Sequence, residues 1–221
     1  MRLRLTAGSI VGALALGAGI ASATAVIYDN DFSSRTEFRA VQKFEGGKSC
    51  RKFFRGRKSF GIEVKRGPLQ CDFRTPVSGD SKEPNHEIEG AAAVLESTAR
   101  PVRRHAYVGV AVRADESSRY ELRVFPQRQT WELRRQPNRS GFPLTGTDES
   151  IAGLGERNRL KLRAFGDKIT ALVNQTTVVD NFTDPAPSEL NGRKTLIVGG
   201  HAGNSPKSAG ADFGNVRIRV P

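Results

Sequence analysis

The chain has 221 residues, of which 37% are hydrophobic and 7% aromatic, and its 35 basic and 23 acidic side chains give a formal net charge of +12. This length allows one globular domain with a hydrophobic core, and the composition is too polar for a membrane-embedded protein. The 23 glycines and 11 prolines, spread along the chain, favour many turns and exclude collagen or a coiled coil.

The N-terminal segment has the layout of a secretory signal peptide. Arg2 and Arg4 precede an uncharged run, 5–25, that is rich in Leu, Ile, Val, Ala and Gly and ends in small residues. This pattern predicts a signal peptide at 1–25 and one secreted domain at 26–221. An uncleaved anchor is the alternative, because the run is long enough to cross a bilayer, although its Ala and Gly content disfavours this. Cleavage lowers the net charge from +12 to +10 and leaves no transmembrane segment.

Two cysteines, Cys50 and Cys71, lie in the predicted mature domain. An exported chain with two cysteines most simply pairs them in a disulfide. Closing this loop is expected to stabilise the fold by about 3 kcal/mol in the chain-entropy model. A zinc site is the poorer interpretation, because two thiolates without histidines at ligand spacing supply half of a site.

Beyond residue 25 the apolar residues recur with a period of two. Val108, Val110 and Val112 alternate with small or charged residues, and so do Val216 and Ile218 near the C-terminus. Such alternation predicts half-buried strands, and the turn clusters between them are spaced as in an all-β sandwich or barrel.

The first hairpin is predicted to join 120–125 to 130–135 through a four-residue loop. In this register residues whose numbers sum to 255 face each other. One face is then apolar, with Tyr120, Leu122, Val124, Trp131 and Leu133. The other face pairs Arg123 with Glu132 and Glu121 with Arg134, and we expect it to be solvated. A slip of one residue would destroy both faces, so the register is well specified.

The second hairpin is predicted to turn at Gly166-Asp167, a dipeptide suited to a two-residue loop with positive φ. Residues whose numbers sum to 333 then face each other. Leu160, Leu162 and Ala164 meet Val173, Ala171 and Ile169 on the apolar face. The other face carries Arg159, Arg163, Lys168 and Thr170, which we expect to be exposed to solvent.

The C-terminal part of the chain, from Glu156 to Val220, resembles the concanavalin A-like (laminin-G-like) jelly-roll superfamily. The resemblance rests on Asn158, Leu160, Leu162, Ala164, Gly166, Ile169, Val173, Asn174 and Val178, then Leu196, Val198 and Gly199, then Asp212, Phe213, Asn215, Val216 and Ile218. It implies two antiparallel sheets packed face to face, with the N- and C-terminal strands adjacent. One departure is Asn174-Gln175 where such domains have Asn-Gly, and because Gln is a poor residue for positive φ we expect a wider turn there.

The superfamily includes lectin-like modules, adhesive domains and glycoside hydrolases, so the fold leaves binding and catalysis open. Glu87 and Glu89 point to one face of a predicted strand and are the nearest approach to a carboxylate pair. Hydrolases of the superfamily that use such a strand have a third acidic residue, and Ala91 stands there in this chain. We therefore expect solvated acids, with no catalytic residue assigned. His86, His105 and His201 form no recognisable triad or metal motif and are expected at the surface or in loops.

Two kinds of ligand-binding residue are candidates. Some lectin-like jelly rolls bind calcium where the terminal strands meet, and Asp29, Asp31 and Asp212 would supply hard oxygen ligands, although these acids would equally cap turns or pair with arginine. The basic surplus forms two clusters that would attract a polyanion: Lys48, Arg51, Lys52, Arg55, Arg57 and Lys58, and then Arg100, Arg103 and Arg104. Composition bias would also explain this surplus.

Aromatic residues add little to this picture. Phe53 and Phe54 are adjacent, so one of the two is expected to be an exposed anchor. Trp131 is assigned to the core by the hairpin register and is therefore no sugar platform. The sequence thus predicts a secreted, disulfide-bonded jelly-roll β-sandwich that acts as a non-catalytic binding or adhesion module for a glycan or an acidic cell-envelope polymer, without specific nucleic-acid recognition. A glycoside hydrolase and a purely structural domain are the alternatives.

Overall fold

The computed structural model describes residues 25–45, 49–55, 59–64, 70–75, 85–114, 118–138, 141–186, 194–198 and 209–220, with the backbone alone at 43–45 and 194–198. The predicted signal peptide, apart from Ala25, lies outside these residues, and so do Lys48, Arg57, Lys58 and His201. Within the described ranges, no helix is long and apolar enough to span a membrane.

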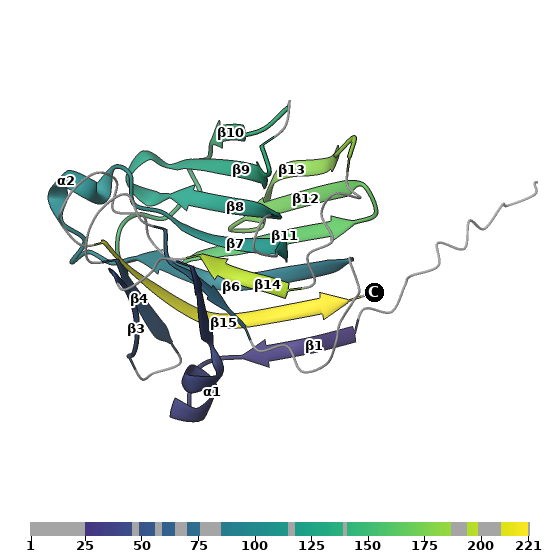
Figure 1. Ribbon diagram of the computed structural model, residues 1–221. Coiled ribbons are helices and arrows are strands. Elements are labelled where there is room, and N and C mark those ends of the chain that lie inside the picture. The colour runs from purple at the N-terminus through teal and green to yellow at the C-terminus, as the bar shows by residue number, and fades with distance from the viewer. Residues whose placement is uncertain are drawn as a thin grey trace, which may run out of the picture.

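Two antiparallel sheets form the domain (Figure 1). The eight-stranded sheet, here called sheet A, has the order β13 (Thr176–Thr183), β12 (Lys168–Val173), β11 (Asn158–Phe165), β6 (His86–Val94), β15 (Ala209–Val220), β4 (Phe60–Val64) and β3 (Cys50–Phe54), and β1 (Ala25–Asn30) also pairs with β15. The seven-stranded sheet B has the order β10 (Leu144–Thr147), β9 (Thr130–Gln136), β8 (Arg119–Phe125), β7 (Val108–Ala114), β14 (Lys194–Val198), β5 (Asp72–Arg74) and β2 (Gln42–Glu45).

Both predicted hairpins are confirmed in register. In the first, Leu122 faces Leu133 and Glu121 faces Arg134, with Pro126–Arg128 forming a short 3-10 helix in the loop. In the second, Leu162 of β11 faces Ala171 of β12, and the chain turns at Gly166 with a φ of 57°. The period of two in the sequence therefore fixed the two faces of these strands.

The N- and C-terminal strands are adjacent, as the resemblance implied. β15 pairs with β6 along one side, while β4 and β1 follow each other along its other side (Figure 1). The long last strand therefore pairs with three strands of sheet A, including the first strand of the domain.

The expected wider turn at Asn174-Gln175 is wrong. β12 ends at Val173 and β13 begins at Thr176, so the loop has two residues, with φ values of 48° at Asn174 and 74° at Gln175. The Asn174 side chain compensates for the strained backbone, because its amide donates to Ser150 O at 2.6 Å and to Asn158 Oδ1 at 2.8 Å. Asn158 is itself buried and bonded in both directions to Ala152, so this turn is anchored to the preceding loop.

The core lies between the two sheets and takes the inward residues of both. Its largest fully buried side chains include Tyr120, Phe60, Phe73, Phe213 and Leu122. Trp131 packs against this core, which confirms its assignment to the apolar face. Burial of these side chains is the main favourable contribution to folding.

In the part of the chain that the structure describes, two short α-helices lie outside the sheets, α1 (Arg35–Ala40) and α2 (Arg100–Arg103). A capping box at Ser34 and Glu37 starts α1. At the C-terminus of α1, Lys52 of β3 donates hydrogen bonds to the carbonyl oxygens of Phe38 at 2.8 Å, Arg39 at 3.1 Å and Val41. Burial lowers the pKa of Lys52, whose ammonium replaces water at the helix C-terminus.

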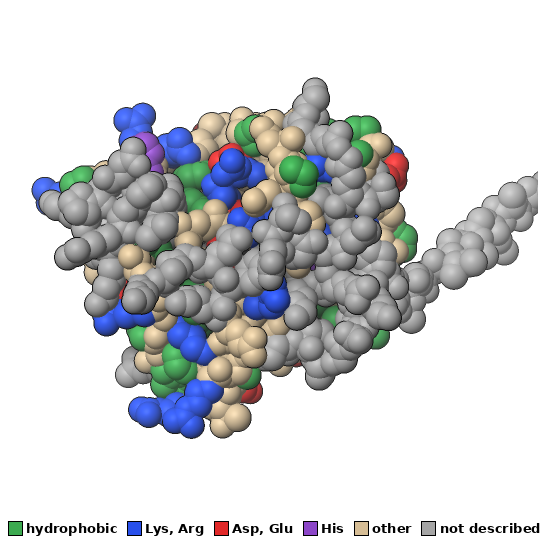
Figure 2. Space-filling view, in the orientation of Figure 1, with side chains coloured by type: hydrophobic (Ala, Val, Ile, Leu, Met, Phe, Trp, Pro, Cys, Tyr) green, Lys and Arg blue, Asp and Glu red, His purple; other side chains and the backbone are tan. Residues whose placement is uncertain are grey.

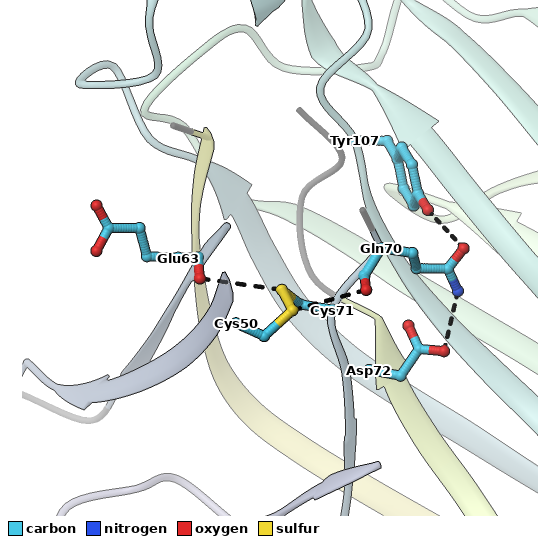
Figure 3. Close-up of a disulfide and its surroundings, with 6 residues drawn as sticks. All are labelled: Cys50, Glu63, Gln70, Cys71, Asp72 and Tyr107. Carbon is cyan, nitrogen blue, oxygen red and sulfur yellow. Dashed lines mark hydrogen bonds between the residues drawn. A yellow bond between two sulfur atoms is a disulfide. The ribbon is translucent and has the colours of Figure 1, made fainter. Parts of the chain in front are cut away.

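The predicted disulfide is confirmed and joins the two sheets (Figure 3). Cys50 begins β3 of sheet A, and Cys71 directly precedes β5 of sheet B, with a Cα–Cα distance of 5.6 Å. Both cysteines are buried. The covalent bond therefore fixes the edge of sheet A to the chain segment that contains Gln70 and Asp72.

A buried ion pair joins the sheets at the opposite end. Asp184 follows β13 of sheet A, and its Oδ2 accepts from Arg135 Nε of β9 at 2.8 Å and from the Tyr120 hydroxyl of β8. The side chains of Arg135 and Asp184 are 0% and 1% exposed. Burial raises the pKa of Asp184, but the hydrogen bonds from Tyr120 and the Ala186 backbone and the Arg135 charge outweigh it, so the pKa is lowered. The carboxylate is therefore ionised and fully engaged.

Replacing both cysteines, as Cys50→Ser with Cys71→Ser, is expected to lower the free energy of unfolding by about 3 kcal/mol, because the unfolded chain regains the entropy of the open loop. Urea denaturation followed by Trp131 fluorescence measures this change. The wild-type protein in reducing buffer serves as the control and should lose the same stability. Equal stability of the double variant and the oxidised protein would contradict the structural role of the bond.

Asp184→Asn is expected to destabilise the domain by about 3 kcal/mol, because it leaves the buried Arg135 guanidinium without a countercharge. The matched control is Asp180→Asn, at an exposed position of β13, where the change should stay within about 0.5 kcal/mol. Thermal and urea unfolding of both variants give the two values. An Asp184→Asn variant as stable as Asp180→Asn would show that the pair contributes nothing to joining the sheets.

Candidate functional site

The outer face of β8 carries three alternate charged residues, Arg119, Glu121 and Arg123. The hairpin register predicted a solvated face here, and this expectation is wrong: all three are buried, with Glu121 only 2% exposed. The reason is that residues distant in sequence pack onto this face. Asp72 of β5 and Tyr107, which directly precedes β7, both contact it.

The buried charges form a continuous chain of ion pairs. Asp72 Oδ2 accepts from Arg119 Nη1 at 2.7 Å, and Arg119 Nε lies 3.3 Å from Glu121 Oε2. The second oxygen of Glu121 pairs with Arg123 Nε. Charges alternate along this chain, so each carboxylate has a guanidinium partner.

Gln70 connects the chain of ion pairs to the disulfide (Figure 3). Its amide nitrogen donates to Asp72 Oδ2 at 3.0 Å and to Glu121 Oε2 at 3.3 Å. Its amide oxygen accepts from Arg123 Nη2 at 2.6 Å and from the Tyr107 hydroxyl at 2.9 Å. Cys71 is the next residue, so the disulfide holds Gln70 in place. These six residues are called the β8 polar cluster: Gln70, Asp72, Tyr107, Arg119, Glu121 and Arg123.

A depression of about 340 Å³ opens above this cluster. Its floor is formed by Arg119, Glu121 and Arg123, and its rim by Arg134, Gln136 and Asn138 of β9 and the residues that follow it. The rim residues are exposed, with 48% of the Arg134 side chain accessible. Figure 2 shows basic side chains, with acidic ones among them, where Figure 1 draws β8 and β9.

Electrostatics keep the cluster in one protonation state. Burial raises the pKa of Glu121, but the positive charges of Arg123 and Arg119 outweigh it, so the pKa is lowered. Burial lowers the pKa of Arg123, but the Glu121 charge outweighs it, so the pKa of Arg123 is raised above its usual range. The pKa of Tyr107 is raised well above its usual value, mainly by burial and then by the Glu121 charge. At neutral pH the carboxylate is therefore ionised and the phenol is neutral.

This arrangement suits recognition of an anionic or hydroxyl-rich ligand. Guanidinium and amide groups are planar donors that match carboxylates and neighbouring hydroxyls in pairs. A buried network holds the floor residues in one geometry, so little side-chain entropy is lost when a ligand binds.

Glu87 and Glu89, the predicted carboxylate pair, lie on the outer face of sheet A, whereas the depression lies on sheet B. Arg219 Nη1 lies 2.5 Å from Glu87 Oε1 and 3.3 Å from Glu89 Oε2, and Lys161 Nζ lies 3.7 and 3.5 Å from the same two oxygens. Burial raises the pKa of Glu89, but the charges and hydrogen bonds of Lys161, Arg159 and Arg219 outweigh it, so the pKa is lowered. The pair is thus a neutralised part of a basic surface.

The aspartates proposed for calcium have other partners in the structure. Asp29 Oδ2 accepts from Arg217 Nη2 at 2.6 Å, and Asp212 Oδ2 accepts from Arg157 Nη2 at 3.1 Å. Asp31 Oδ1 accepts from the Ser33 backbone at 2.9 Å. Within the described ranges, no three histidine, cysteine or acidic side chains gather as a metal site would require.

Several residues of the predicted polyanion clusters form contacts that stabilise the fold. Arg51 pairs with Glu63 at 2.6 Å, and Lys52 ends α1 as described above. Arg103 donates to Thr98 O at 2.9 Å and Glu96 O at 2.7 Å, which secures α2. Arg55, Arg100 and Arg104 are exposed.

The expected exposed aromatic anchor is wrong. Phe54 packs on Phe38 of α1, with ring centroids 5.8 Å apart, and Phe53 lies over Gly61, where the absence of a side chain makes room for its ring. Both residues are half-buried. His86, expected at the surface or in a loop, is buried on β6, where its Nε2 accepts from the Arg113 backbone at 3.1 Å.

Sequence reasoning missed the β8 polar cluster as a site. The available signal was the alternation of Arg119, Glu121 and Arg123 on a strand whose other face is entirely apolar. Gln70, Asp72 and Tyr107 carry no such signal, because the contacts that bring them to β8 and to each other span 37 to 53 residues of the chain.

Comparisons with known proteins found similar structures but no similar sequences. No protein-family model and no curated protein sequence matches the chain. The carbohydrate-binding module CBM66 from Bacillus subtilis superposes with a TM-score of 0.55 at 13% identity, over 82% of this chain and 96% of the module. A laminarinase from Flavobacterium sp. UMI-01 gives 0.60 at 8% identity, over 89% of this chain and all of the enzyme.

An alginate lyase of polysaccharide lyase family 7 gives a TM-score of 0.51 at 14% identity, over 80% of this chain and 85% of the lyase. At these identities the likeness establishes the fold, which is the concanavalin A-like jelly roll that the sequence resembles.

Glu121→Gln is expected to lower the free energy of unfolding at pH 7 by about 3 kcal/mol, because the buried Arg123 guanidinium loses its countercharge and Arg119 retains Asp72 alone. The folded-state pKa of Glu121 is depressed, so its contribution is present above the unfolded value of about 4.3 and is lost as the pH falls through the folded value. Stability should therefore decline less from pH 7 to pH 3 in the variant than in the wild type. Urea unfolding at several pH values measures both slopes, with Glu132→Gln as the control at a more exposed pair. Parallel curves for wild type and Glu121→Gln would contradict this assignment.

Proposed function

We propose that the protein is a non-catalytic binding module for acidic polysaccharides, and that the depression above the β8 polar cluster holds the ligand. The single observation that carries this proposal is the donor set of the depression. Arg119 and Arg123 in the floor and Arg134 at the rim surround Glu121, whose charge is already balanced within the cluster. A carboxylated sugar would complete the coordination of the rim guanidinium.

Its size and neighbours support a glycan as the ligand. About 340 Å³ falls within the range of small-ligand sites, and the exposed rim residues leave the depression accessible to a polymer. The similar structures include a carbohydrate-binding module, a laminarinase and an alginate lyase. The net charge of the chain, +12 before any processing, favours an acidic polymer among glycans.

Hydrolysis is less well supported than binding. A glycosidase needs one carboxyl group whose raised pKa keeps a proton for the leaving oxygen. In the β8 polar cluster the pKa of Glu121 is lowered, and both Asp72 and Glu121 form ion pairs with Arg119 and accept a hydrogen bond from the same Gln70 nitrogen. Glu89 on sheet A also has a lowered pKa. Tyr107 is 1% exposed, so its hydroxyl does not face a substrate.

The proposal places the protein outside the cytoplasm. A buried disulfide between the sheets is typical of exported proteins, since cytoplasmic thiols are kept reduced. The signal-like segment at the N-terminus supports the same location.

Calorimetric titration with polygalacturonate, and with neutral dextran for comparison, tests the function. We expect binding of polygalacturonate that weakens with added salt, and none of dextran. Arg134→Ala should weaken binding about tenfold, because it removes one charge-assisted hydrogen bond without touching the buried floor. Arg128→Ala, at an exposed arginine of the same hairpin, is the matched control and should bind like the wild type. Equal loss in both variants, release of reducing ends or unsaturated products, or no binding at low salt would overturn the proposal.

A further inference from the structure

The outer face of sheet A carries a second set of basic side chains, which face away from the depression in sheet B. They occupy alternate positions of β11 and β15, and the row on β11 begins one residue before that strand. These residues are called the sheet A track: Arg157, Arg159, Lys161, Arg163, Arg217 and Arg219.

The strand register places β6 between the two rows of cations. Lys161 faces Glu89 on β6, and Glu89 faces Arg217 on β15. One step along, Arg163 faces Glu87, which faces Arg219. Each glutamate therefore lies between two basic residues on neighbouring strands, where cross-strand attraction fixes the cations in place.

Within the described residues, the six cations of the track outnumber the four acids that pair with them, which are Asp29, Glu87, Glu89 and Asp212. Glu89 alone has three basic partners, Arg159, Lys161 and Arg219. Arg163 has no acidic partner within the described residues, and its guanidinium lies 5.2 Å from the ring centre of Phe165. The face therefore retains positive charge after all its internal pairs are formed.

Two depressions follow each other along β11. The first, of about 400 Å³, is lined by Arg157, Arg159 and Arg217 together with the amides of Asn174 and Asn215. The second, of about 270 Å³, is lined by Lys161, Arg163 and Arg219 and ends at Phe165, which is 40% exposed. An extended ligand along the strand would thus meet cations, amides and one aromatic ring in turn.

We propose that the sheet A track is a second binding surface for an extended anionic polysaccharide, and that the two faces of the sandwich together bridge two polymer chains. The second surface stands on its own observations, while the bridging rests on the proposed function of the depression in sheet B. Strand geometry gives a length of about 26 Å from Arg157 to Phe165, enough for several sugar units in line.

The side chains on this face favour a polysaccharide over the other polyanions. Single-stranded nucleic acid is bound by successive aromatic side chains that stack on the bases, and the described part of the track offers Phe165 alone. A membrane surface would require an apolar anchor cluster within the basic patch. Carboxylates spaced along a glycan chain instead match guanidinium groups that recur every second residue, with the exposed Asn215 amide beside them for hydroxyls.

The double variant Arg157→Ala with Arg163→Ala tests the proposal, because both residues lie on the surface and at opposite ends of the track. The probe is polygalacturonate, and its binding is measured by calorimetry and by the turbidity that bridged chains produce. We expect two classes of site in the wild type, one class in the double variant because the track site is lost, and loss of turbidity. Arg39→Ala with Arg128→Ala, which removes two exposed arginines outside the track and outside both predicted basic clusters, is the matched control and should behave like the wild type.

Three results would overturn the proposal: unchanged stoichiometry and turbidity in the Arg157 and Arg163 double variant, the same loss in the control, or tighter binding of oligo(dT) or phosphatidylserine vesicles than of polygalacturonate at equal salt. Unfolding curves of each variant establish that the loss is local. Arg134→Ala separates the two surfaces. If it changes nothing while the track variant abolishes binding, the proposed function of sheet B fails and the track remains.

Discussion

The pleat of β8 is the constraint on which the candidate site depends. Alternate residues of one strand must serve opposite environments, so Tyr120, Leu122 and Val124 enter the core while Arg119, Glu121 and Arg123 point to the outer face. Any slip in register would bury charge between the sheets and expose the apolar set. The core therefore fixes the positions of Arg119, Glu121 and Arg123 as firmly as it fixes its own side chains, and a binding site built on a strand inherits that rigidity.

Charge balance is the second common feature of the two faces. On sheet B the carboxylates of Asp72 and Glu121 alternate with guanidinium groups, and on sheet A Glu87 and Glu89 lie between cations. In both places the acids orient the bases and leave a surplus of donors. Carboxylates held ionised in this way are poor proton donors, which is why the same chemistry that favours recognition of an acidic glycan disfavours its hydrolysis.

The disulfide connects stability to the site. It joins β3 to the segment before β5, and Gln70 in that segment bonds to Asp72 and Tyr107 (Figure 3). Gln70 also bonds to Glu121 and Arg123. A single covalent bond thus fixes both the edge of the sandwich and the residue at the centre of the polar cluster. At the other end Asp184 and Arg135 join the sheets by charge, so the sandwich is secured on both sides of the depression.

The sequence by itself determined the strands, the register of both hairpins, the pairing of Cys50 with Cys71 and the apolar position of Trp131, because these follow from local alternation and from having two cysteines. Tertiary structure alone decided that Glu121 and Arg123 are buried, that Phe54 is covered by Phe38, and that Asn174-Gln175 forms a tight turn supported by Ser150 and Asn158. Each of these depends on a partner from a distant part of the chain. Alternation shows which way a side chain points, but the packing of remote segments decides whether it meets water or protein.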